Sequence, residues 1–207
     1  MIKAVIFDLD GVIVSTDELH YKAWKKMADK ENVYFDEKIN NNLRGISREK
    51  SLEIILKLDS KKYSDEEKAQ LMKYKNEIYI KSLKTITPND ILPKIKSILN
   101  TLKEKKIKIA IGSSSKNAKL ILKQIGLLDY FDAISDGTNI TFSKPHPEVF
   151  LKAASMLHVS PSNCGVVEDA LSGIEAAKNA NMVAFATGDA LHSNLKDYDL
   201  ESLLLMV

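Results

Sequence analysis

Short runs of apolar residues alternate along this chain with longer stretches in which apolar positions recur every three or four residues. The runs have the length of buried strands, and the stretches have the period of amphipathic helices. The expected strands are Lys3–Phe7, Lys108–Ile111, Gly165–Val167 and Val183–Ala186, with Ala133–Ile134 as a candidate fifth. Strand, turn and helix repeated in this order predict an α/β fold with a parallel sheet and helices on both faces. Ligands of such sheets bind beyond the carboxyl ends of the strands.

The segment from Ser15 to Leu83 interrupts this alternation, because it contains no convincing strand. Its expected helices run from Ser15 to about Glu31, from Arg48 to Leu58 and from Ser64 to about Lys81. Ser15 with Glu18, and Ser64 with Glu67, have the spacing of capping boxes. The turn residues Thr87-Pro88-Asn89-Asp90 indicate the return to the sheet. We therefore expect a helical cap domain of residues 15–87, inserted after the first strand, and a core domain of residues 1–14 and 88–207.

Composition narrows the classes of protein that the chain can belong to. It has 207 residues, a net charge of +2 and one cysteine, Cys164. A balanced charge argues against a dedicated nucleic-acid surface, and a single cysteine excludes an internal disulfide. The apolar stretch near the N-terminus is too short for a signal peptide, and no window has the length of a transmembrane helix. We expect a cytoplasmic protein that binds neither nucleic acid nor membranes, and a monomer, because nothing in the sequence indicates an interface.

Two carboxylates follow the first expected strand directly, in the run Asp8-Leu9-Asp10-Gly11. Residues two apart in an extended chain point the same way, so Asp8 and Asp10 can face one site while Leu9 packs into the core. One carboxylate can act as nucleophile and metal ligand, and the other as general acid and base. Gly11 allows a tight turn. The alternative is a strand terminus that carries two acids by chance.

Two further segments carry groups that suit a phosphate. Gly112-Ser113-Ser114-Ser115-Lys116-Asn117 follows the second strand and leads into a helix, where hydroxyl and amide groups bind oxyanions. The alternative is ordinary helix capping by Ser115. Lys144, in the stiff run Ser143-Lys144-Pro145-His146-Pro147, can neutralise a phosphoryl oxygen. The alternative there is a surface lysine in a loop, and His146 has no expected role.

A second pair of acids, Glu168 and Asp169, follows the strand that ends at Val167. If this strand lies beside the first, its acids can meet Asp8. Magnesium prefers hard oxygen ligands and keeps several waters, so one or two carboxylates from each strand are enough to bind it. The alternative is that Asp169 caps the helix that starts near Leu171.

Together these residues resemble the haloacid dehalogenase superfamily of phosphoryl-transfer enzymes, and the likeness covers nearly the whole chain. The matching segments are Phe7-Asp8-Leu9-Asp10-Gly11-Val12-Ile13, Arg44-Gly45-Ile46-Ser47-Arg48, Lys75-Asn76, Ser113 to Asn117, Ser143-Lys144-Pro145 and Glu168-Asp169, with Thr16, His20 and Trp24 between the first two. The resemblance implies a Rossmann-like sheet and an α-helical cap.

The resemblance also assigns roles. Asp8 and Asp10 would be catalytic, and Asp8, Glu168, Asp169 and the main-chain carbonyl of Asp10 would hold Mg²⁺. The residues implied in substrate or phosphate binding are Thr16, His20, Trp24, Gly45, Ile46, Arg48, Lys75, Ser113, Ser114, Ser115, Lys116, Asn117 and Lys144. Spacing alone would make Thr16, His20 and Trp24 one packed helix face.

The implied activity is that of an isomerase, transiently a phosphoprotein, in carbohydrate metabolism. It would interconvert β-glucose 1-phosphate and glucose 6-phosphate through an aspartyl phosphate and β-glucose 1,6-bisphosphate. A sugar-phosphate phosphatase of the same superfamily is the alternative, and a binding module with a relict site is a third.

The chain departs from the superfamily's pattern in two places. Ala170 stands where the motif has a small hydroxyl residue, which removes at most a minor hydrogen bond. After Leu200 the chain ends in Glu-Ser-Leu-Leu-Leu-Met-Val, so we expect an abbreviated final helix with an exposed apolar end.

Overall fold

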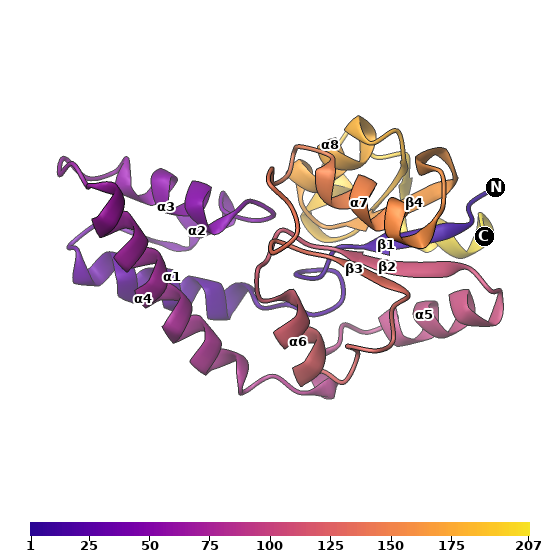
Figure 1. The fold of residues 1–207 in the computed structure, drawn as a ribbon, viewed down its shortest axis with the longest axis horizontal. Helices are drawn as coiled ribbons and strands as arrows, with labels where there is room; N and C mark the ends of the chain where they lie inside the picture. The colour runs from indigo at the N-terminus through magenta and orange to yellow at the C-terminus, as the bar shows by residue number, and fades with distance from the viewer.

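A single parallel sheet forms one part of the molecule (Figure 1), in a computed structural model that describes residues 1–207. Its strands are β1 (Ala4–Phe7), β2 (Lys108–Gly112), β3 (Ala133–Ser135), β4 (Cys164–Glu168), β5 (Val183–Ala186) and β6 (Tyr198–Asp199), in the order β3-β2-β1-β4-β5-β6. Every pairing is parallel. The expected α/β fold is confirmed, and β1 lies at the centre, between β2 and β4.

Alternate residues of β1 point to opposite faces of the sheet. Val5 and Phe7 belong to a buried cluster that contains apolar residues of α5 (Ile95–Glu104) and α6 (Ala118–Gln124). Ala4 and Ile6 belong to a second cluster, with residues of α7 (Glu148–Leu157) and α8 (Leu171–Asn179). The strands are buried on both faces, as apolar runs without alternation predict.

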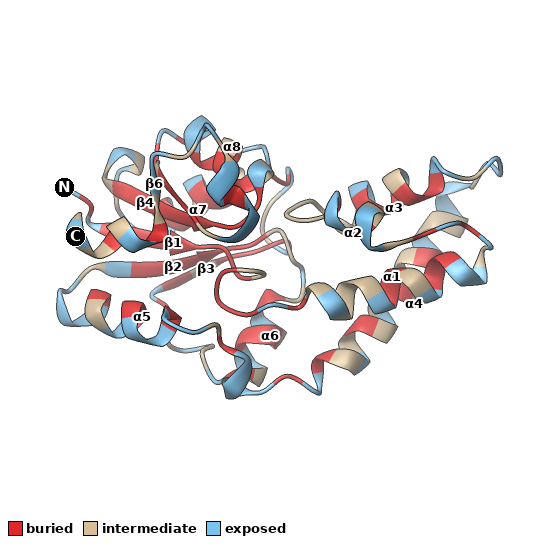
Figure 2. Ribbon diagram, turned by 180° about the vertical axis from the view of Figure 1, so that it is seen from behind, coloured by how far each residue is buried: buried red, intermediate tan, exposed pale blue.

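The other part of the molecule is helical and lies beyond the carboxyl ends of the strands (Figure 1). It contains α1 (Asp17–Lys30), α2 (Glu37–Asn41), α3 (Arg48–Leu56) and α4 (Asp65–Leu83). These helices enclose an apolar cluster of their own around Trp24, Met27, Leu52 and Ile55. Figure 2 shows the buried residues of this cluster as stripes on α1 and α4, on the sides where the two helices face each other. We call α1 to α4 and their loops the helical region.

Helix α4 begins at the expected capping box. Ser64 Oγ accepts a hydrogen bond from the Glu67 amide at 3.2 Å, and the Glu67 carboxylate accepts one from the Ser64 amide at 2.8 Å. The capping box predicted for Ser15 and Glu18 is wrong. The cap residue of α1 is Thr16, which makes no capping bond because its hydroxyl donates to Asp10 instead.

The remaining elements are short 3-10 helices: η1 (Pro88–Asp90), η2 (Pro161–Asn163), η3 (Gly188–His192) and η4 (Leu200–Leu205). The expected short C-terminal helix is η4, which buries Leu203 and leaves Leu205 87% exposed. Both termini lie at the end of the sheet that faces away from the helical region (Figure 1). None of the helices combines the length and hydrophobicity that crossing a bilayer requires.

Candidate active site

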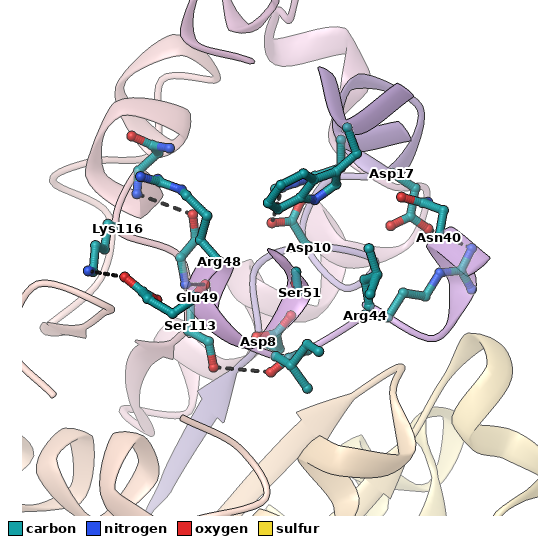
Figure 3. Close-up of a pocket in the computed structure, with 18 of the residues that line it drawn as sticks. Asp8, Asp10, Asp17, Asn40, Arg44, Arg48, Glu49, Ser51, Ser113 and Lys116 are labelled. Atoms are coloured by element: carbon teal, nitrogen blue, oxygen red, sulfur yellow. Dashed lines mark hydrogen bonds and ion pairs between the residues drawn. The ribbon is translucent and has the colours of Figure 1, made fainter. Parts of the chain in front are cut away.

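A pocket of about 880 Å³, counted to its open mouth, lies between the strand ends and the helical region (Figure 3). Most of the residues singled out in the sequence line it. They are Asp8, Asp10, His20, Trp24, Gly45, Ile46, Arg48, Lys75, Ser113, Ser114, Ser115, Lys116, Asn117 and Asp169. Chain segments more than 150 residues apart therefore meet in one cavity, as expected from the shared sheet edge.

Three of the singled-out residues, Thr16, Lys144 and Glu168, are absent from the pocket lining and lie buried beside it. Each contacts a residue that does line the pocket or its floor. Lys144 Nζ donates to Asp8 Oδ1 at 2.5 Å and also to Glu168, while the Thr16 hydroxyl donates to Asp10. The alternative of a surface lysine is wrong, because the Lys144 side chain is completely buried.

The floor of the pocket carries an acidic cluster. Carboxylate oxygens of Asp8, Glu168 and Asp169 all lie within 4.8 Å of one another. The pairing of β1 with β4 causes this, because it aligns Phe7 with Val167 and so places the residues that follow side by side. Lys144 supplies one positive charge to three carboxyl groups, so ionisation of all three would leave an excess of negative charge.

That excess changes how these acids titrate. Burial, with the nearby charges of Glu168 and Asp8, raises the pKa of Asp169 to about 9. Burial also raises the pKa of Glu168 to about 7, although Lys144 opposes the change. For Lys144 burial acts to lower the pKa, but Asp8 and Glu168 outweigh it and raise the pKa. A cluster that resists full ionisation in this way is chemically suited to a divalent cation with oxygen ligands.

The turn after β1 leaves room for the Asp169 carboxylate only because residue 11 is glycine. Gly11 has φ +79°, and a Cβ there would lie 2.0 Å from Asp169 Oδ2. Any larger residue would therefore occupy the space that the Asp169 carboxylate now fills.

Glu168 has a second set of partners. Its Oε2 accepts hydrogen bonds from the amides of Asp169 at 3.0 Å and Ala170 at 3.1 Å, at the start of α8. The alternative that Asp169 caps α8 is wrong, because the cap residue is Ala170 and Asp169 makes no capping bond. Glu168 thus braces the turn that presents Asp169 to the cluster.

Asp10 points into the same pocket from the other side of Leu9. Its Oδ1 accepts from the Thr16 hydroxyl, and its Oδ2 lies 3.9 Å from His20 Nε2. Burial raises the pKa of Asp10 to about 7, with a smaller contribution from the Asp8 charge, while the Thr16 hydrogen bond opposes the rise. A carboxyl with this pKa can donate and accept a proton at neutral pH.

A group of buried polar residues joins α1 to α4 behind Asp10. Lys75 Nζ lies 2.8 Å from His20 Nδ1 and 4.7 Å above the Trp24 ring. Burial, helped by the Arg48 charge, lowers the pKa of Lys75 well below its usual value. The Tyr79 hydroxyl lies 2.9 Å from Thr16 Oγ1, so α4 also braces the residue that holds Asp10.

The serine loop after β2 makes hydrogen bonds within itself and contacts across the pocket. Ser113 Oγ accepts from the Ser115 amide at 3.1 Å, and Ser115 Oγ accepts from the Asn117 amide at 3.2 Å. Ser114 Oγ donates to the Gly45 carbonyl at 3.2 Å, which ties this loop to the helical region. Lys116 Nζ lies 2.7 Å from Glu49 Oε1 (Figure 3). The alternative that Ser115 caps the helix is wrong, because the cap residue of α6 is Asn117 and no side chain makes a capping bond there. Ser115 bonds within the loop and lines the pocket.

Six lining residues were not singled out as site residues: Asp17, Asn40, Leu43, Arg44, Glu49 and Ser51. Asn40 lies on α2, whose five residues give too short a pattern to read as a helix. Arg44 belongs to the matching segment Arg44 to Arg48 but received no role there, and Glu49 directly follows that segment, so extending it by one residue would have found Glu49.

The comparisons with known proteins agree with this arrangement. A family model described as haloacid dehalogenase-like hydrolase matches residues 2–181. The chain is 48% identical over 188 residues to the β-phosphoglucomutase of Bacillus subtilis (strain 168), covering 90% of this chain and 83% of that protein. It is 30% identical to the phosphorylated carbohydrates phosphatase of Thermotoga maritima, covering 87% and 82% of the two chains. The crystal structure of β-phosphoglucomutase from Clostridium difficile matches with a TM-score of 0.93 at 44% identity, covering 100% of this chain and 94% of that one.

Proposed function

This chain belongs to the haloacid dehalogenase-like hydrolase family, and we propose that it has β-phosphoglucomutase activity. It interconverts β-glucose 1-phosphate and glucose 6-phosphate by way of a phosphorylated aspartate and β-glucose 1,6-bisphosphate. Two of the similar proteins carry this name, at 48% and 44% identity. Phosphatases among the relatives are less similar, at 30 to 32% identity.

The observation that carries the proposal is the pair Asp8 and Asp10 on one pocket wall, in two different electrostatic settings. Asp8 lies in the acidic cluster, hydrogen-bonded to the buried ammonium of Lys144. Asp10 is held by Thr16 outside that cluster, with its pKa raised to about 7 by burial. Two carboxyl groups with separated roles fit a nucleophile and a general acid–base.

In the proposed reaction, Asp8 attacks the phosphorus of the bisphosphate and the bond from phosphorus to the sugar oxygen breaks. Asp10 gives its proton to that oxygen as it leaves. When the phosphoryl group comes from the 1-position, the sugar left is glucose 6-phosphate, which departs, and β-glucose 1-phosphate enters. Asp10 then takes the proton from the 6-hydroxyl of this second sugar, whose oxygen attacks the phosphoryl group on Asp8, so that the bond from Asp8 to phosphorus breaks and the bisphosphate forms again. Lys144 lies where it can balance the charge of the phosphoryl oxygens, since phosphoryl transfer depends on positioning and charge stabilisation.

We propose Mg²⁺ as the metal, held by Asp8, Asp169 and the main-chain carbonyl of Asp10. Glu168 contributes by bracing Asp169, because both of its oxygens already have hydrogen-bond partners. When bound, Mg²⁺ would neutralise negative charge that develops on the transferred group. The chemistry of the oxygen donors favours a hard divalent ion over zinc or copper.

The second phosphate of the substrate needs a grip away from Asp8. We propose that Arg48 provides it, with Ser115, Lys116 and Asn117 of the loop after β2, because these residues line the same pocket. A guanidinium binds phosphate through two parallel hydrogen bonds. Residues 15–87 then act as a cap over a core of residues 1–14 and 88–207, and closure of the cap excludes water from the phosphorylated Asp8.

A direct assay tests the proposal. The protein receives β-glucose 1-phosphate with Mg²⁺ and a trace of β-glucose 1,6-bisphosphate. Glucose 6-phosphate formed without equivalent phosphate release is the expected result. Release of free phosphate alone would overturn the mutase reading in favour of a sugar-phosphate phosphatase.

A further inference from the structure

The segment Arg44-Gly45 of the helical region contacts three loops that follow strands of the sheet. Ser114, after β2, donates its hydroxyl to the Gly45 carbonyl at 3.2 Å. A Cβ at Gly45 would lie 2.5 Å from Ser172 Oγ, at the start of α8 after β4. Asp189, after β5, accepts a hydrogen bond from Arg44 Nη1. The segment is therefore wedged against the ends of β2, β4 and β5.

Arg44 bridges two carboxylates from different parts of the chain. Its Nη2 lies 2.7 Å from Asp17 Oδ2 in the first turn of α1, and its Nη1 pairs with Asp189 on η3. The Arg44 side chain is 27% exposed and that of Asp17 is 31% exposed, whereas Asp189 is 73% exposed. Asp189 is not among the residues that line the pocket. The Asp189 carboxylate has no side-chain hydrogen bond or ion pair other than that with Arg44, so it serves the junction alone.

The two carboxylates that Arg44 joins are each connected to the pocket, one to the turn that carries Asp169 and the other to the residue that holds Asp10. On the sheet side, η3 is bonded to the acidic cluster, because the Ala190 amide donates to the Asp169 carbonyl at 2.8 Å. On the helical side, Asp17 directly follows Thr16, whose hydroxyl holds Asp10. The ion pairs of Arg44 thus join the turn that presents Asp169 to the turn that presents Asp10.

We propose that Arg44, Asp17 and Asp189 form a clasp that holds the helical region closed over the pocket. Asp189 is then a positioning residue for transfer fidelity: it acts through Arg44 to decide how often phosphorylated Asp8 passes its phosphoryl group to a sugar and how often to water. The fidelity part of this inference rests on the proposed function, and the clasp itself does not.

Because the ion pair at the Asp189 end of the clasp is exposed, the clasp favours the closed form of the helical region but does not prevent it from opening. Pairs of this kind change a two-state ratio by about two- to five-fold, and salt weakens them. Opening of the helical region admits water to Asp8, and the clasp reduces the fraction of time spent open.

The test compares Asp189→Asn with Glu201→Gln. Glu201 is a matched control, because it is an exposed acid, 67% exposed, in an ion pair with Lys94 at 3.4 Å that does not reach the helical region. Spin labels at Lys62→Cys and Glu104→Cys report the distance between the two parts of the molecule. Both positions are exposed, and Cys164 is buried and takes no label.

In Asp189→Asn we expect the closed-to-open ratio to fall about two- to five-fold, and the effect of salt on that ratio to shrink. Glu201→Gln should match the parent protein. Identical distance distributions in Asp189→Asn and the parent would overturn the clasp, whatever reaction the protein catalyses.

The fidelity part is read from the ratio of phosphate released to glucose 6-phosphate formed. We expect Asp189→Asn to raise this ratio by about the same two- to five-fold, with kcat for transfer changed less than the ratio. A shifted distance distribution with an unchanged product ratio would overturn the positioning role. Absence of glucose 6-phosphate from the parent protein would instead contradict the proposed function and leave the distance result standing.

Discussion

Asp10 differs from an ordinary surface aspartate in what surrounds its carboxyl group. Burial raises its pKa from 3.8 to about 7, and the Thr16 hydroxyl opposes that rise only in part. Between these two pH values the folded protein holds a proton that the unfolded chain releases. The stability that Asp10 contributes is therefore full below pH 3.8 and is lost as the pH rises through about 7.

Asp10→Asn removes this titration while keeping an oxygen that can accept the Thr16 hydrogen bond. We expect the melting temperature of the metal-free variant, relative to that of the metal-free parent, to be at least about 2 °C higher at pH 8 than at pH 5. Glu168 and Asp169 titrate in both proteins and cancel in the comparison. Thermal unfolding followed by circular dichroism measures the effect. A difference that is the same at both pH values would refute the raised pKa.

At the scale of elements, the turn after β1 depends on the conformation and the size of one residue. Gly11 combines φ +79° with a Cβ position 2.0 Å from the Asp169 carboxylate. Gly126 has φ +73°, but its nearest neighbour would be Pro88 Cγ at 4.0 Å. Replacing either glycine by alanine would strain the backbone by about 1–2 kcal/mol. Only at residue 11 would the new Cβ also clash with a neighbouring side chain.

Gly11→Ala is expected to weaken divalent-metal binding about 10- to 100-fold, because it displaces a carboxylate of the cluster. Gly126→Ala is the control, and it should lose similar stability while keeping the metal affinity of the parent. Isothermal titration with Mg²⁺ measures both. Equal affinities in the two variants would argue that Asp169 has no part in the metal site.

Much of the fold could be predicted at this same scale. Five strands are apolar runs, and their burial on both faces makes the runs easy to recognise. Strand β6 was missed because Tyr198–Asp199 forms only two pairs, with Phe185 and Ala186, and has no apolar run. The start of α1 was predicted wrongly because Ser15 and Glu18 have the right spacing for a capping box, while Thr16 is drawn to Asp10.

The predictable part of the site is the part that the sheet brings together. Strand ends meet at one edge, so Asp8, Ser113 and Asp169 could be placed together before their distances were known. Contacts between the helical region and the sheet follow from no such rule. The pair of Arg44 and Asp189 joins residues 145 positions apart through loops, and neither side chain stands in a pattern that predicts the other.

At the scale of the whole molecule, the site lies where the sheet meets the helical region, and α1 and α4 reach across this junction, because Ala23, Tyr79 and Leu83 belong to a cluster on one face of the sheet. The clusters on the two faces of the sheet contain no residue of α2 or α3, and the cluster of the helical region contains none of the sheet. The acidic cluster lies on the sheet side of this junction, where carboxylates repel one another until a cation binds. Binding of a cation should therefore stabilise the folded molecule.

We expect Mg²⁺ at about 100 times its dissociation constant to stabilise the protein by about 2.7 kcal/mol, or to raise its melting temperature by about 5–10 °C. Asp169→Asn should lose most of this increase. Melting curves with and without Mg²⁺, with a chelator as the reference, measure it. An equal increase in Asp169→Asn and the parent would place the metal elsewhere.

The proposed mechanism requires Asp8 to carry the transferred phosphoryl group, and mass spectrometry tests this most directly. The protein is exposed to β-glucose 1,6-bisphosphate with Mg²⁺, quenched in acid, digested and mapped. We expect the added mass of one phosphoryl group on the peptide that contains Asp8, its absence in Asp8→Ala, and a loss of turnover in that variant of at least about a thousand-fold. A phosphoryl group found on another residue, or an Asp8→Ala variant with near-normal turnover, would contradict the mechanism.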